Sequence, residues 1–151
     1  MGGVKILIFL LIPIIGLCQT SELTLNDIKS INSEEMFKKV MMERGLERWK
    51  EEEKEGQIVY GDVIGDEGVN TQLYSLYMIE SDVCFISFDS SNGHLEREYN
   101  SLFDKVKSKC SYDEIDSSTD TEFIKYDCGD GFKIGFGKEG DILMVLKYPK
   151  E

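Results

Sequence analysis

The sequence contains a single histidine, His94, and this scarcity narrows the catalytic mechanisms open to the chain. A histidine base needs a nucleophile and an orienting partner within reach. No serine lies in a nucleophile elbow, and no cysteine has a histidine near it in the sequence. We therefore interpret His94 as a surface residue at a helix entrance. No catalytic residue is predicted, and we expect the chain not to be an enzyme.

Metal and cofactor motifs are scarce as well. The four cysteines include no C-x-x-C pair, which argues against a zinc framework. The acids within residues 113–120 lack the order of ligands that an EF-hand loop requires. Residues 135–140 form a literal G-x-G-x-x-G, but a strand is predicted after them where a dinucleotide site needs a helix. We interpret these glycines as strand and turn glycines of a closely approached hairpin, and predict no metal ligand and no cofactor.

Positive charge is in short supply. The chain has 17 Lys and Arg against 29 Asp and Glu, which gives a net charge of -12. Such a field repels polyanions, so nucleic acid and anionic membrane surfaces are not expected as partners. A partner guided by charge would be cationic. The alternative is that the acidity only keeps an exported protein soluble.

Long hydrophobic runs are absent except near the start of the chain. Lys5, the apolar residues 6–15 and the small residues before the end of the segment predict a signal peptide over residues 1–18, cleaved after Cys18. The run is shorter than the roughly 20 residues of a membrane span, so the mature chain is expected to lack a transmembrane anchor. We expect a secreted or periplasmic bacterial protein. The alternative is a lipid anchor at Cys18, because residues 15–18 resemble a lipobox except at Leu17.

Residues 19–151 are predicted to form a single α+β domain. Apolar residues recur at helical spacing over 95–110 and after the cap at residues 32–33, and a shorter helical candidate lies within 21–31. Alternation and β-branched or aromatic content predict strands at 57–63, 72–79, 83–89, 123–128, 132–137 and 142–148. The expected fold is a two-layer arrangement, a mostly antiparallel six-stranded sheet with two helices on one face.

The order of one helix and three strands occurs twice, which suggests a duplicated α-β-β-β unit. A shift of 66 positions aligns Phe37 with Phe103 and Val40 with Val106, and the first strand of each half follows in the same register. The later strands need a shift of 60, so chance and shared amphipathicity are the alternative. The layout is similar to the repeated helix-and-sheet units of secreted inhibitors such as the β-lactamase-inhibitor protein. This similarity is one of architecture without a shared motif, and it implies no residue roles.

Three cysteines follow residue 18, namely Cys84, Cys110 and Cys128. Strand alternation places Cys128 on the helix-facing side near the end of its strand, and Cys110 ends the helix above it. We predict a disulfide between Cys110 and Cys128, with Cys84 as a buried free thiol. The alternative is three separate reduced cysteines.

Alternation also predicts which face of the sheet is left free. The predicted helix-facing residues are Ile58, Tyr60, Ile124, Tyr126, Phe132, Ile134, Phe136, Met144, Leu146 and Tyr148. The opposite face is expected to carry an apolar patch of Leu73, Tyr77, Phe85, Leu143 and Val145, larger than a monomer normally exposes. We interpret this patch as an interaction surface for a protein partner or a second copy of the chain. Alternatively, residues 19–31 or 46–56 fold over it.

The sequence therefore predicts an exported, non-enzymatic binding module that uses the open sheet face, its acidic loops, or both. Two alternatives remain. The first is a small periplasmic hydrolase or metal-dependent enzyme in which His94 and nearby acids perform acid and base chemistry. The second is an envelope-associated structural lipoprotein.

Overall fold

Three helices and eight strands make up the part of the chain that the computed structural model describes, residues 21–62 and 72–149. The helices are α1 (Leu25–Ser30), α2 (Glu34–Glu43) and α3 (Gly93–Lys109). The strands are β1 (Glu47–Arg48), β2 (Gln57–Gly61), β3 (Leu73–Met78), β4 (Val83–Asp89), β5 (Ser111–Asp116), β6 (Phe123–Asp127), β7 (Lys133–Glu139) and β8 (Ile142–Lys147). The predicted signal peptide and Cys18 lie outside the described residues. Within those two ranges, no helix combines the length and apolar character needed to cross a membrane.

Each helix begins at a capping residue that the sequence provides. The Thr24 side chain accepts the backbone N–H of Asp27, and the Asp27 carboxylate accepts the N–H of Thr24, which forms a capping box at α1. Ser33 caps α2 and Asn92 caps α3 in the simpler one-sided way. Gly45 follows α2 with a φ of 76°, a left-handed conformation that stops the helix.

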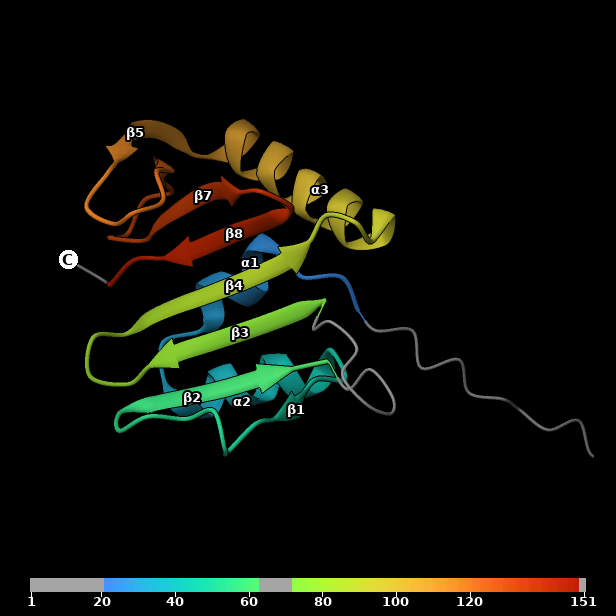
Figure 1. The fold of residues 1–151 in the computed structure, drawn as a ribbon. Coiled ribbons are helices and arrows are strands. Elements are labelled where there is room, and N and C mark those ends of the chain that lie inside the picture. Colours follow the sequence, from blue (N-terminus) through green and yellow to red (C-terminus); the bar gives the residue numbers. More distant parts are fainter. Residues whose placement is uncertain (1–20, 63–71, 150–151) are drawn as a thin grey trace, which may run out of the picture.

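The strands form one antiparallel sheet in the order β1-β2-β3-β4-β8-β7-β6-β5 (Figure 1). The predicted α+β fold with an antiparallel sheet is confirmed, but the count of six strands and two helices was too low. The helical candidate at 21–31 forms α1, and the two additional strands, β1 and β5, lie at the outer edges. Both edge strands consist mainly of charged or polar residues, so their own sequence does not indicate a strand. Pairing with β2 and β6 overrides that weak propensity.

The same order of elements occurs twice along the chain. Helix α2 is followed by β1 to β4, and α3 is followed by β5 to β8. The two groups of four strands meet where β4 pairs with β8 at the centre of the sheet. Each half therefore contains a helix and four strands, where three strands were predicted. A duplication of the sequence stays a prediction.

All three helices pack on the same face of the sheet, and Figure 1 shows α1 and α2 behind the strands. The Phe37 ring of α2 lies 5.7 Å from the Tyr60 ring and 5.2 Å from the Tyr77 ring. The Tyr99 ring of α3 lies 6.0 Å from Phe88 and 5.6 Å from Phe136. These aromatic contacts place the core between the helices and one side of strands β2, β3, β4 and β7.

The predicted faces were wrong for β3 and β8. The structure buries Leu73, Tyr77, Leu143 and Val145 against the helices, where the open face was expected. Both strands are apolar on both sides, so alternation alone does not select the buried side. The register selects it, because Val145 pairs directly with Ile86 on the helix-facing side of β4.

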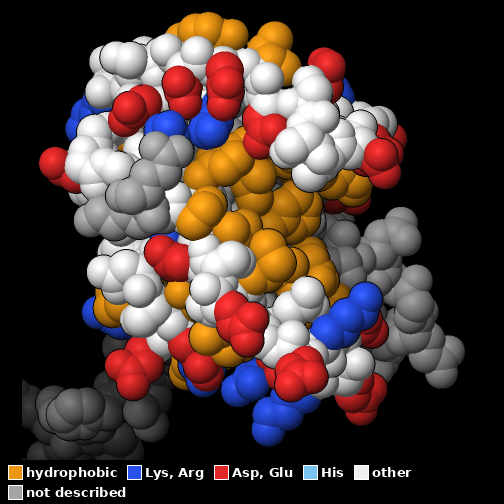
Figure 2. All heavy atoms as spheres, turned by 90° about the vertical axis from the view of Figure 1, so that its left-hand side faces the viewer, with side chains coloured by type: hydrophobic (Ala, Val, Ile, Leu, Met, Phe, Trp, Pro, Cys, Tyr) orange, Lys and Arg blue, Asp and Glu red, His pale blue; other side chains and the backbone are white. Residues whose placement is uncertain are grey.

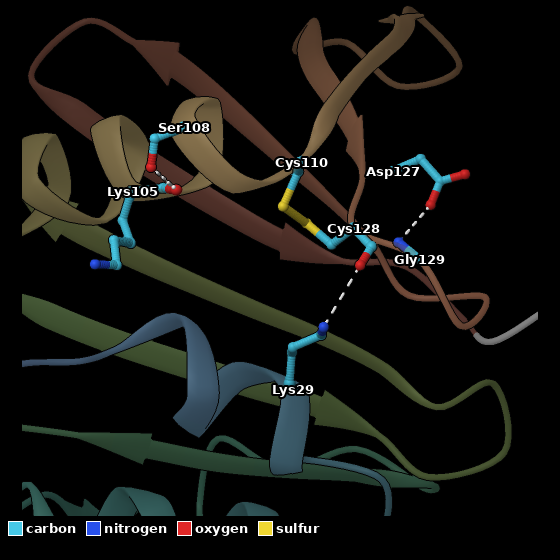
Figure 3. The surroundings of a disulfide bond; sticks show 7 residues. All are labelled: Lys29, Lys105, Ser108, Cys110, Asp127, Cys128 and Gly129. Carbon is cyan, nitrogen blue, oxygen red and sulfur yellow. Dashed lines mark hydrogen bonds between the residues drawn. A yellow bond between two sulfur atoms is a disulfide. The ribbon is translucent and has the colours of Figure 1, made fainter.

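A disulfide joins the end of α3 to the residue after β6, as predicted. Cys110 and Cys128 are bonded and partly buried (Figure 3). The Nζ of Lys29, from α1, lies 3.5 Å from the Cys128 carbonyl oxygen that it points toward. Cys84 on β4 is buried and is the free cysteine of the residues that the structure describes.

A buried ion pair joins the end of α2 to α3. The Arg44 Nη1 lies 2.6 Å from the Glu98 Oε1, and the two side chains are 5% and 2% exposed. The same carboxylate accepts the N–H of Leu23, and Arg44 donates to the carbonyl of Ser21. The Arg44–Glu98 pair therefore fixes the segment before α1 against the end of α2 and against α3.

Candidate interaction surface

The sheet face opposite the helices carries apolar side chains from its three central strands. Leu76, Phe85 and Leu146 pair across β3, β4 and β8 and stand side by side in one row. We use the name central patch for six half-buried residues of this face: Tyr74, Leu76, Met78, Val83, Phe85 and Leu146. Figure 2, which views the molecule from the left-hand side of Figure 1, shows hydrophobic side chains gathered in a hollow bordered by charged side chains.

The β2 end of this face is covered by the charged segment 46–56. The Trp49 ring lies on Gly61, where a Cβ atom would come within 2.4 Å of the ring. Beside it, Val59 is fully buried although it points to the open side. Segment 46–56 therefore covers the β2 end, as one predicted alternative held, but the central patch stays half-buried. The other predicted cover, within residues 21–31, packs into the core on the helix side instead.

The other end of the face is covered by aromatic rings that lie on glycines of β7. A Cβ atom on Gly135 would meet the Tyr148 ring at 3.0 Å, and one on Gly137 would meet the Phe123 ring at 3.0 Å. The absence of side chains at these positions lets both rings lie close to the strand. This confirms that the G-x-G of the sequence marks a closely approached hairpin.

At the border of the central patch beside β5, lysine and tyrosine side chains pair with carboxylates. The Nζ of Lys125 donates to Glu114 at 3.1 Å, and the Tyr148 hydroxyl donates to Asp116 at 2.7 Å. Hydrogen bonds from Ser118 and Tyr148 hold the pKa of Asp116 below its ordinary value. Burial, followed by the hydrogen bond to Asp116, raises the pKa of Tyr148. The border therefore presents an ionised Asp116 carboxylate and a neutral Tyr148 phenol at neutral pH.

Phe85 is the one member of the predicted patch that the structure places on the open face. Sequence reasoning missed Leu76 and Leu146, since the wrong sides of β3 and β8 were selected. Lys147 contributed to that error, because a lysine is normally expected to face water. It is buried on the helix side, and its Nζ lies 2.9 Å from both the Oδ2 and the carbonyl oxygen of Asp82.

The two residues with reactive side chains, His94 and Cys84, lie in different surroundings. His94 is exposed in the first turn of α3, and its backbone N–H donates to Asn92. Burial raises the pKa of the Cys84 thiol to about 12, so it is uncharged and a poor nucleophile at neutral pH. In the described ranges, no three His, Cys, Asp or Glu side chains are grouped to hold a metal ion.

Comparisons with protein-family models, with curated proteins and with solved structures found no match to this chain. The similarity of layout to secreted inhibitors therefore rests on the order of helices and strands alone, and it assigns no role to any residue.

Proposed function

We propose that the protein is an exported, non-enzymatic binding module that holds a protein partner on the central patch. The observation that carries this proposal is the patch itself: six half-buried apolar side chains from adjacent strands, on a face that none of the described helices covers. Apolar areas rimmed by polar residues are typical of protein interaction sites. These side chains stand on three hydrogen-bonded strands, which hold them in place before a partner binds. This lowers the conformational entropy that is lost on binding.

The composition of the patch and its border indicates the chemistry of the partner. Tyr74, Phe85 and Met78 belong to the residue types that are enriched at protein interfaces. The border carries Glu114 and Asp116, and the whole chain has a net charge of -12. The complementary partner is a protein with an apolar protrusion surrounded by basic residues. Opposite charges would also speed its association.

Export is supported by the sequence of residues 1–18 and by the disulfide, since disulfides persist mainly in oxidising compartments. The proposed location is the periplasm or the external medium after cleavage behind Cys18. Lipid anchoring at Cys18 is the alternative, and it would show as an increased mass of the N-terminal peptide.

Capture from the envelope and medium of the source cell tests the proposal with three matched baits. The wild type is compared with a Phe85→Ser/Leu146→Ser variant and with a Met42→Ser control, because Met42 is an exposed apolar residue of α2 outside the patch. We expect the same protein to be captured by the wild type and the control, and lost with the patch variant. Equal capture by all three baits would refute the proposal, provided that circular dichroism shows all three folded.

A further inference from the structure

A second apolar surface lies at the β5 edge of the sheet. Six large hydrophobic side chains are exposed among the described residues, and three of them are on β5 and β6. Tyr112 is 61% exposed, Ile115 is 55% exposed and Ile124 is 39% exposed. Tyr112 pairs with Tyr126 and Ile115 pairs with Ile124, so these side chains share the helix-facing side of the sheet, where α3 leaves them uncovered. Half of the exposed large hydrophobic side chains of the described residues therefore lie at the β5 edge of the sheet.

A cleft of about 550 Å³ opens beside these residues. Phe103 of α3, Ile115, Ile124 and Phe136 form its apolar part. Acidic residues 120, 122 and 139, with one lysine, lie along its rim. The volume is within the roughly 300 to 1,000 Å³ of clefts that hold organic ligands or large side chains.

The opposite side of β5 carries the carboxylates of Asp113, Glu114 and Asp116, which also pair with Lys125, Lys133 and Tyr148. The register shifts between Tyr112 and Ile115, as in a β-bulge, and the extra residue lets two successive acids reach the same lysine. Asp113 lies 3.9 Å and Glu114 lies 3.1 Å from the Nζ of Lys125, on the open side of the sheet. Strand β5 therefore presents apolar side chains on one side and carboxylates on the other.

The two edges of the sheet are built differently. The edge strand β1 has 2 residues, whereas β5 has 6 and pairs with β6 on one side. An edge strand offers backbone N–H and C=O groups to any chain that can pair with it, and proteins commonly protect such edges by shortening them. The β1 edge is protected in this way, whereas the β5 edge, which has a bulge and charged side chains on one side, keeps its length and two exposed apolar residues.

We propose that β5 accepts an extended cationic segment of a partner protein as a ninth strand. Apolar residues at alternate positions of that segment would cover Tyr112 and Ile115, and a larger one would enter the cleft. The intervening Lys or Arg residues would face Asp113, Glu114 and Asp116. A second copy of this chain is a poorer occupant, because antiparallel pairing of two β5 strands brings like charges together. The six residues of the central patch play no part in this inference, although Glu114 and Asp116 also border that patch.

The probe is a synthetic peptide of about ten residues that alternates lysine and valine, a length typical of strands. Its control is the same peptide with N-methyl groups on every backbone nitrogen, which removes the donors of ladder hydrogen bonds from both edges of the peptide. We expect saturable binding that weakens with added salt, and slower amide exchange at residues 111–116. Equal binding of the N-methylated peptide, or no binding of either, would overturn strand addition.

Matched variants locate the site. Two variants should each weaken peptide binding about tenfold, which corresponds to about 1.4 kcal/mol. They are Ile115→Ser and the double variant Asp113→Asn/Glu114→Gln. Ile79→Ser is the control, because Ile79 is exposed to a similar degree at another place. Phe85→Ser should bind the peptide like the wild type, which separates this surface from the central patch. Loss of binding with Phe85→Ser, unchanged binding with Ile115→Ser, or dimerisation through β5 in the absence of peptide would contradict the inference.

Discussion

Removal of the Cys110–Cys128 disulfide provides a test with a magnitude that follows from the structure. The two cysteines are separated by 18 residues. In the chain-entropy model, a closed loop of this length removes about 11 cal/mol/K from the unfolded ensemble, which is about 3 kcal/mol at 25 °C. The double variant Cys110→Ser/Cys128→Ser should therefore lose about 3 kcal/mol of unfolding free energy.

The packing around the disulfide indicates that the variant should still fold. Val106 of α3 is fully buried, and the Phe103 ring contacts Tyr126 across the two layers at 6.0 Å. These contacts hold the end of α3 on the sheet without the covalent bond. The bond is therefore expected to act mainly on the unfolded chain, which it makes more compact.

Urea denaturation followed by the fluorescence of Trp49, the one tryptophan of the chain, measures the loss. With a slope of about 2 kcal/mol per M, the midpoint should fall by about 1.5 M. Reduced wild type should match the double variant, which is the internal control. A loss below about 1 kcal/mol would show that the entropic reasoning fails here, and an unfolded variant would show that the bond is needed for native packing.

Three further predictions concern the buried groups of Glu98 and Cys84. Glu98→Gln leaves Arg44 buried without its carboxylate, so thermal unfolding should show a loss of about 3 to 5 kcal/mol of unfolding free energy. Replacing both Glu98 and Arg44 with methionine should cost less stability. The opposite order of the two losses would contradict the argument. Burial raises the pKa of the Cys84 thiol from 9.0 to about 12, so the native state should protect it from thiol reagents at about pH 8, and urea should expose it. Because the fold favours the neutral thiol, the contribution of Cys84 to the unfolding free energy is complete below the pKa of the unfolded chain and is lost as pH rises toward 12. A Cys84→Val variant should therefore lose less stability than the wild type between pH 9 and 12. Equal losses in the two proteins would contradict this.

The helices and the disulfide could be predicted because their signals are local. Helical spacing marks α2 and α3, and the predicted cap at residues 32–33 lies where α2 begins, at Ser33. Cys110 and Cys128 end neighbouring elements, so a coarse two-layer arrangement suffices to pair them. Such features depend on a few adjacent residues and on the face that they share.

The free face and the sheet edges could not be predicted in the same way because they depend on pairing. In β3, the residues on both sides are apolar, and Leu76 and Tyr77 differ in burial only because Tyr77 lies under Phe37. In β8, Lys147 is buried through its ion pair with Asp82. Strand β5 carries too few apolar residues to stand out, and its partner β6 determines its conformation.

The central claim is that a protein partner sits on the central patch, and a photo-crosslink at that position tests it most directly. Benzoylphenylalanine placed at position 85 reacts only with groups that it touches, and the same residue at position 42 is the control on α2. We expect irradiation in the presence of envelope extract to give one discrete adduct from position 85 and none from position 42. No adduct from position 85, or the same adduct from both positions, would contradict the account.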